Sequence, residues 1–197
     1  MTASIQGTGS NAAFGAAVAG FLYSITFVLL ARYAPDAAVG VYSFFLLVGG
    51  LLSSLALVAL WERLRGASPG WALWALAVGL FAALGSAIHA GYDLANAVQP
   101  QGGTTNLPSQ IDPRGLLTFG VAGLSIAAFT WLMSGAADWP SRFVYLGFAS
   151  AVLLVLIYLF RLIAPNSQAV LAPAALEGFI VNPLWYVWLG IELRRET

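Results

Sequence analysis

The hydrophobic positions of this chain are arranged in six long runs separated by polar intervals. The runs cover about residues 12–31, 38–61, 71–97, 115–137, 143–162 and 169–191. Each has roughly twenty residues or more, enough for an α-helix to cross a hydrocarbon core of about 30 Å. The pattern therefore predicts an all-α fold: a polytopic bundle of six membrane-spanning helices, forming one transmembrane domain over residues 1–197.

The polar flanks predict the topology. Residues 1–11 lack the basic segment of a secretory signal, so we expect the first hydrophobic run to be retained as a span. Six spans place both termini on one side, together with five arginines, and leave three on the other. The five are Arg63, Arg65, Arg142, Arg194 and Arg195, and the three are Arg32, Arg114 and Arg161. By the positive-inside rule both termini are expected in the cytoplasm, with the protein in the cell (inner) membrane.

The composition supports a membrane protein and excludes several kinds of chemistry. The chain is 60% hydrophobic and 8% charged, whereas about a quarter of the residues of a soluble domain are charged. It contains no cysteine, and all eight basic residues are arginine, so thiolate and lysine Schiff-base chemistry are excluded. The net charge of zero gives no reason to expect nucleic acid. One histidine excludes a bis-histidine haem and a three-ligand zinc site, and we expect no cofactor and no metal.

Small residues recur every four positions along the third run: Ala75, Gly79, Ala83, Ala87 and Gly91. On a helix they form one stripe, which lets a neighbouring backbone approach closely. The opposite side of the same helix carries Gly85, His89, Asp93 and Asn96. Both faces are therefore expected to contact protein or water, which predicts a central position for this helix.

Ionisable side chains are expected to gather in the outer third of the bundle. At 1.5 Å per residue, His89 lies about 27 Å along its helix and Arg161 about 28 Å, while Glu177 lies about 12 Å below the outer boundary. Asp93 and Arg32 fall near the same level. We predict a polar pocket there, opening beneath the loop 99–114. Its candidate ligand-binding or proton-carrying residues are His89, Asp93, Glu177, Arg161, Tyr158 and Asn96.

Structural roles are the alternative for these residues. Arg32, Asp93 and Arg161 are near enough to helix ends to reach the interface, and a single histidine often satisfies a local hydrogen bond. Glu177 is deeper, so we expect it to be neutral, to meet Arg161 or His89, or to face a water-filled cavity. The loop 99–114 is rich in residues that break regular structure, and it is either a connector or a lid.

The sixth run has a pattern typical of broken helices. Pro173 and Pro183 flank Glu177, and Pro183 leaves the carbonyl of Phe179 without its helical donor. Broken helices with an acidic residue are typical of transporters. No nucleotide-binding, serine-hydrolase or zinc-protease motif occurs, so we expect no catalytic residues.

Several short motifs resemble a known family. They are Asn182-Pro183-Leu-Trp185-Tyr186-Val-Trp188-Leu-Gly190-Ile-Glu-Leu193, Trp139-Pro140 leading to Arg142 and Tyr145-Leu-Gly147, Gly20-Phe-Leu-Tyr23, and His89-x-x-Tyr92-Asp93. Together they resemble a bacterial family of small six-span membrane proteins classed as a domain of unknown function. The resemblance covers nearly the whole chain and implies a six-span fold, with no catalytic residue and no substrate.

Three hypotheses on function follow. The leading one is non-enzymatic: a membrane protein that binds a lipid-like or small apolar ligand in the outer pocket, or an accessory subunit of a membrane complex. Its partners are then the lipid bilayer and another membrane protein or a second copy. The alternative is a proton-linked small-molecule transporter that uses Glu177. A third is an intramembrane lipid-modifying enzyme, with His89 as base and Asp93 as its orienter.

Overall fold

The computed structural model describes residues 5–99, 112–165 and 167–195, and every regular element in these ranges is a helix. The first half contains α1 (Ile5–Ile25), the π-helical η1 (Thr26–Leu30), α2 (Ala31–Tyr33), α3 (Pro35–Leu64) and α4 (Pro69–Val98). The second half contains η2 (Pro113–Gly115), η3 (Leu116–Val121), α5 (Ala122–Ser134), α6 (Ser141–Ile163), η4 (Gln168–Val170), α7 (Leu171–Leu176), η5 (Glu177–Val181) and α8 (Asn182–Arg194).

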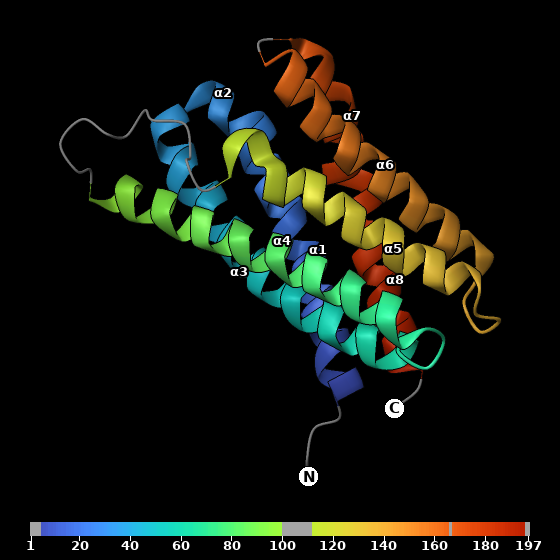
Figure 1. Ribbon diagram of the computed structural model, residues 1–197. Coiled ribbons are helices and arrows are strands. Elements are labelled where there is room, and N and C mark those ends of the chain that lie inside the picture. The colour runs from blue at the N-terminus through green and yellow to red at the C-terminus, as the bar shows by residue number, and fades with distance from the viewer. Residues whose placement is uncertain (1–4, 100–111, 166, 196–197) are drawn as a thin grey trace.

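Six continuous helical runs are long and apolar enough to cross a membrane, which confirms the predicted number of spans. They are Ile5–Tyr33, Pro35–Leu64, Pro69–Val98, Pro113–Ser134, Ser141–Ile163 and Gln168–Arg194. Most are longer than the hydrophobic runs, because the helices continue into polar flanking residues. Three begin at a proline, whose missing N–H costs nothing in the first helical turn. The two ends of the chain lie at one end of the bundle, termed here the terminal end (Figure 1).

The six spans form a closed ring. Following the contacts, α4 packs on α3, α3 on α1, α1 on α8, α8 on α6, α6 on α5, and α5 returns to α4. The third span thus has a neighbour on each side, α3 and α5 (Figure 1). A ring of six helices leaves space along its axis, which side chains must fill if the bundle is to be solid throughout.

Large side chains fill this space at the terminal end. Phe143, at the start of α6, stacks on Trp139 with ring centroids 5.7 Å apart and on Trp185 of α8 at 5.9 Å. Phe129 of α5 and Leu60 of α3 are fully buried in the same core. Aromatic residues of this size bury about 150–250 Å² each, so the terminal end of the ring is solid.

The contact between α3 and α4 brings two backbones together. A Cβ atom on Gly50 would lie 2.6 Å from the Ala83 carbonyl oxygen and 3.1 Å from the Ala87 Cβ. Only a residue without a side chain allows this approach. Ala83 and Ala87 belong to the stripe of small residues on α4, and both lie at this interface.

The remaining stripe residues lie along the same helix. The Ser125 hydroxyl of α5 donates a hydrogen bond of 2.9 Å to the Ala75 carbonyl. A Cβ on Gly79 would lie 2.5 Å from the Ser125 hydroxyl oxygen. Gly91 faces Leu47 of α3, with more room. The stripe therefore packs on both neighbours, α3 and α5.

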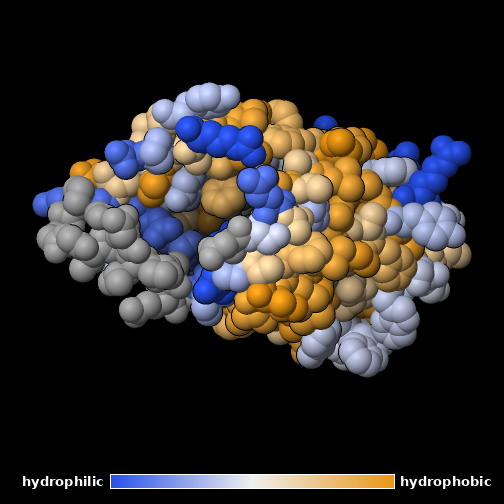
Figure 2. Space-filling model, turned by 90° about the horizontal axis from the view of Figure 1, so that it is seen from above, coloured by the Kyte–Doolittle hydropathy of each residue, from blue (hydrophilic) through white to orange (hydrophobic). Residues whose placement is uncertain are grey.

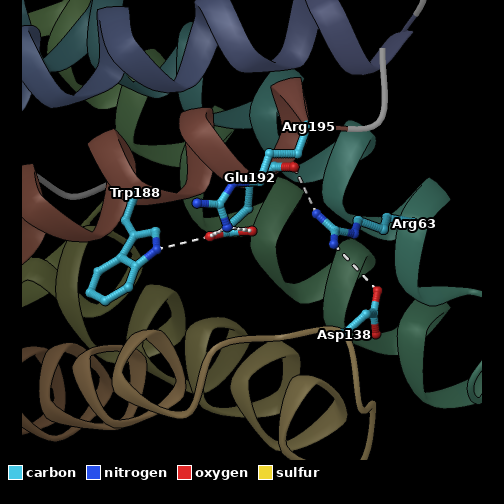
Figure 3. A network of polar contacts seen from close by, with 5 residues as sticks. All are labelled: Arg63, Asp138, Trp188, Glu192 and Arg195. Carbon is cyan, nitrogen blue, oxygen red and sulfur yellow. Dashed lines mark hydrogen bonds and ion pairs between the residues drawn. The ribbon is translucent and has the colours of Figure 1, made fainter.

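A polar network joins three elements at the terminal end (Figure 3). The Glu192 carboxylate is 2% exposed and accepts hydrogen bonds from the Arg195 guanidinium at 2.8 and 3.0 Å and from the Trp188 indole at 3.0 Å. Arg63 of α3 donates to the Glu192 carbonyl oxygen at 2.9 Å and pairs with Asp138 at 3.3 Å. The network therefore links α3, α8 and the turn between α5 and α6.

Replacing Gly50 by alanine should destabilise the fold. The added methyl has to separate α3 from the α4 backbone, and such overpacking costs about 1–3 kcal/mol. Gly49 is the matched control, because a Cβ there would lie 3.5 Å from Ala19, an ordinary contact. Thermal unfolding in one detergent should show a lowered midpoint for G50A and an unchanged or raised one for G49A. Equal midpoints for the two variants would contradict the close approach.

The network predicts a difference between two glutamate–arginine pairs. Glu192→Gln removes charge-assisted hydrogen bonds from a buried carboxylate and should cost about 1–3 kcal/mol. Glu62→Gln affects a pair with Arg65 in which the side chains are 33% and 54% exposed, and such pairs contribute about 0–1 kcal/mol. The measurement is again thermal unfolding, and equal losses in the two variants would show that the buried network adds nothing.

Candidate functional site

A cavity of about 500 Å³ lies inside the ring, and residues of all six spans line it. Seen from the end opposite the termini, the surface is hollowed, with hydrophilic residues around the hollow and hydrophobic atoms at its floor (Figure 2). Along the first span the lining extends from Ala16 to Arg32, a length of about 24 Å at 1.5 Å per residue. The volume is within the range of small-molecule sites, about 300–1,000 Å³.

The wall contains all three π-helical segments of the described residues. Phe27 of η1, Thr118 and Phe119 of η3, and Glu177 and Gly178 of η5 line the cavity. π-helical turns are rare and occur frequently at functional sites. Their concentration around one space marks it as the candidate site of this molecule.

For two of these π-helical segments, η5 and η3, the structure shows what interrupts the regular α-helical hydrogen bonding. Pro183 has no N–H to donate to the carbonyl of Phe179, and η5 is the turn directly before it. At η3 the Asp112 carboxylate accepts hydrogen bonds from the Leu117 N–H at 2.6 Å and from the Thr118 N–H at 3.2 Å. The carboxylate thus satisfies donors at the start of the fourth span, and the Thr118 hydroxyl donates to it as well at 2.6 Å.

Most of the cavity wall is apolar in effect. Three of its four serine hydroxyls donate to backbone carbonyls, and the fourth, of Ser53, interacts with the Tyr186 hydroxyl. Ser24 donates to Gly20 at 2.9 Å, Ser86 to Ala82 at 2.8 Å and Ser125 to Ala75 at 2.9 Å. A ligand inside the cavity therefore meets methyl, methylene and aromatic groups more than hydrogen-bonding partners.

Glu177 is the exception in the interior. It is 3% exposed, and its Oε1 accepts a hydrogen bond of 2.6 Å from the Ser150 hydroxyl of α6. The Asn182 side chain, from the next turn of the same helix, is also within hydrogen-bonding reach of this carboxyl. The second oxygen, Oε2, has no hydrogen bond of normal geometry within the described residues. This leaves one buried polar atom in the cavity wall for a ligand or water to satisfy.

Three arginines line the cavity at its open end: Arg32, Arg114 and Arg161. Arg161 lies over the Phe119 ring, 5.7 Å from its centroid. None of the three makes an ion pair with a carboxylate of the described residues. The lining near the mouth therefore carries three guanidinium groups that form no ion pair within the described residues.

Arg114 has an uncommon backbone conformation. Its φ of 58° lies in the left-handed region, as does the 77° of the following Gly115. For a residue with a side chain this costs about 1–2 kcal/mol, and such strain concentrates at functional sites. Two consecutive left-handed residues turn the chain into the fourth span, with Arg114 at the mouth of the cavity.

The structure brings together only part of the predicted site. Glu177 and Arg161 line the cavity, but the other four candidates are not among its lining residues. His89 and Asp93 meet each other on α4, with Nε2 and Oδ2 3.3 Å apart. Tyr158 packs its ring against Gly120, and Asn96 is half-buried near the end of α4.

Other parts of the prediction have different outcomes. Residues 100–111 of the loop 99–114 lie outside the described residues, so its role as connector or lid stays a prediction. Within the described part of the chain no group of three residues is placed to hold a metal ion. Sequence reasoning did not single out Arg114 or Ser150 as part of the site. Ser150 is 27 positions from its partner Glu177, and no local pattern signals that pairing.

Comparisons with protein-family models, with curated proteins and with solved structures find no match for this chain. The resemblance to a six-span family of unknown function therefore stays a prediction. The six apolar helices are those of a multi-pass membrane protein, and the function has to be argued from the cavity alone.

Arg114→Gly should stabilise the fold, because glycine adopts a positive φ without the cost that arginine carries. The expected gain in unfolding free energy is about 1 kcal/mol. Gly115→Ala is the opposite case: its φ is also positive, and the added Cβ would meet the Phe119 ring, so the variant should unfold at a lower temperature. Thermal unfolding in detergent tests both, and a destabilised R114G would show that the left-handed turn is not strained.

Proposed function

We propose that this multi-pass membrane protein is a binding protein for a lipid-like ligand, held in the cavity enclosed by the six spans. The observation that carries the proposal is the cavity itself, which is elongated, is lined by all six spans and lies under the hollow of Figure 2. Most of its wall is apolar, and three of its four serine hydroxyls donate to backbone carbonyls. Apolar pockets with a few polar groups are the usual form of small-molecule sites.

We also propose that the protein lies in the cell membrane with both termini in the cytoplasm. The terminal end carries five of the eight arginines, in agreement with the positive-inside rule. In this orientation the cavity opens toward the outer leaflet. A lipid of that leaflet then has a direct path into the site, without crossing the membrane.

Native mass spectrometry of the protein extracted in mild detergent tests the proposal. The wild type should retain a lipid-sized adduct, and Ala122→Phe should lose most of it, because Ala122 lines the cavity and a phenyl group there fills part of the space. Leu124→Phe is the control on the same helix, since Leu124 is 52% exposed on the outside of the bundle. L124F should behave as the wild type.

The outcomes separate the cavity from the outer surface. Loss of the adduct in A122F but not in L124F supports binding in the cavity. An adduct that survives in both variants would place the lipid on the outer surface, and the proposed function would then be wrong. Equal thermal midpoints of the two variants serve as the check that A122F is folded.

Proton-linked transport is a second candidate function, favoured by one observation. Glu177 is buried in the cavity wall with one carboxyl oxygen unsatisfied, and acidic residues in broken helices carry protons in transporters. Glu177→Gln keeps the shape of the side chain but cannot change charge. In proteoliposomes with an imposed pH gradient, wild type should acidify the lumen faster than E177Q; equal rates would end this candidate.

The enzyme hypothesis receives less support from the geometry. His89 and Asp93 lie within 3.3 Å of each other, as a base and its orienter would. Neither lines the cavity, however, so a ligand held there would not meet them. The pair is accounted for by a contact between neighbouring turns of α4.

A further inference from the structure

The arginines at the two ends of the bundle differ in their partners. At the terminal end Arg63 pairs with Asp138, Arg65 with Glu62 and Arg195 with Glu192. At the mouth of the cavity, Arg32, Arg114 and Arg161 pair with no carboxylate of the described residues. Three of the five arginines at the terminal end thus form ion pairs, whereas the three that line the cavity form none within the described residues.

Two acidic residues near the mouth, Asp112 and Asp93, have partners other than the three arginines. Asp112 accepts hydrogen bonds from the backbone N–H groups of Leu117 and Thr118 and from the Thr118 hydroxyl. Asp93 faces His89 on its own helix. Within the described residues neither these two carboxylates nor Asp36, four positions after Arg32, forms an ion pair with any of the three arginines, so their guanidinium groups remain available to an external anion.

Guanidinium groups select oxyanions. Each presents five N–H donors in a planar fork that matches the oxygens of a phosphate or a carboxylate. Hydrogen bonds of this kind are about twice as strong as those between neutral groups. Three such groups around one opening favour an anionic head group over a zwitterionic or neutral one.

The depth of the cavity matches one lipid chain. Ser150, the partner of Glu177, precedes Arg161 by eleven positions on α6. At 1.5 Å per residue the Glu177 carboxyl is therefore about 16 Å deeper than Arg161. Half of a hydrocarbon core of about 30 Å is about 15 Å, so the distance between the arginines and the level of Glu177 is about the length of one acyl chain.

The interior also fixes the orientation of such a ligand. Between Arg161 and Glu177 the lining includes Leu154 and Ile157 of α6, which suit an acyl chain. At the inner end, the acidic Glu177 offers no positive charge to an oxyanion. An anionic amphiphile is thus bound favourably only with its head at the mouth and its chain inside.

We infer that Arg32, Arg114 and Arg161 form a binding site for the oxyanion head group of a lipid whose acyl chain occupies the cavity. This inference rests on the proposed function and names the class of its ligand, an anionic amphiphile. A phosphate-bearing membrane lipid and a fatty acid share this chemistry. A free anion without a chain would use the arginines but not the cavity.

A lipid titration followed by native mass spectrometry tests this inference. The probes are palmitoyl-oleoyl phosphatidylglycerol, phosphatidylcholine with the same acyl chains, and oleate; inorganic phosphate in excess is the competitor. The delipidated wild type should bind one phosphatidylglycerol at least about fivefold more tightly than phosphatidylcholine. Comparing oleate with phosphatidylglycerol then distinguishes a carboxylate from a phosphate head group.

Arginine variants on one helix supply the matched comparison. Arg161→Gln should weaken phosphatidylglycerol about tenfold, the effect of losing one charge-assisted interaction. Arg142→Gln removes the same charge from the other end of α6, where Arg142 is exposed, and should leave binding unchanged. Arg161→Lys keeps the charge without the fork and should lose less than R161Q.

Each remaining outcome decides against one of the two proposals. Equal affinities for phosphatidylglycerol and phosphatidylcholine, both lost in A122F, would keep the cavity as a lipid site and overturn the role of the arginines. Equal weakening by R161Q and R142Q would also overturn it, as an effect of surface charge. Displacement of the lipid by inorganic phosphate would assign the arginines to a free anion. Binding unaffected by A122F would overturn the proposed function itself.

Discussion

The structure depends on how closely helices can approach one another where there is no water to drive them together. In lipid the hydrophobic effect does not favour helix association, so van der Waals contact between backbones has to supply the attraction. The contact of Gly50 with the Ala83 carbonyl provides this for α3 and α4, and Gly79 with Ser125 for α4 and α5. The first, fifth and sixth spans complete the ring through the contacts of α1 with α3, α8 with α1 and α6 with α5.

What fills the axis differs between the two ends. At the terminal end Trp139, Phe143 and Trp185 stack across it, and the Glu192 network ties the same elements together. Away from the terminal end the lining includes small residues such as Gly49 and Ala82, and a cavity remains along the axis. The cavity therefore results from a change in side-chain size along the axis. The helices themselves stay in contact around the whole ring.

The sequence predicts the number and approximate position of the spans, because lipid requires long apolar helices and hydropathy reports them directly. It does not predict how each helix is rotated about its own axis. Lipid and protein core are both apolar, so hydropathy does not distinguish the face of α4 that carries His89 from the face that lines the cavity at Ser86. Arg161 and Glu177 were found because depth along a helix follows from residue number. Ser150 was missed, because the hydroxyl that faces a carboxyl on another helix depends on rotation.

The solid terminal end has a consequence for how a ligand could reach the cavity and leave it. A transporter must open alternately at both ends. Here the terminal end is filled by the largest fully buried side chains of the described residues, Trp185, Phe129 and Phe143. Opening it would require pulling apart stacked rings and the α3–α8 connection through Arg63. In the conformation that the structure describes, the cavity therefore communicates with the end opposite the termini, and passage through the bundle would first require Trp185, Phe129 and Phe143 to separate.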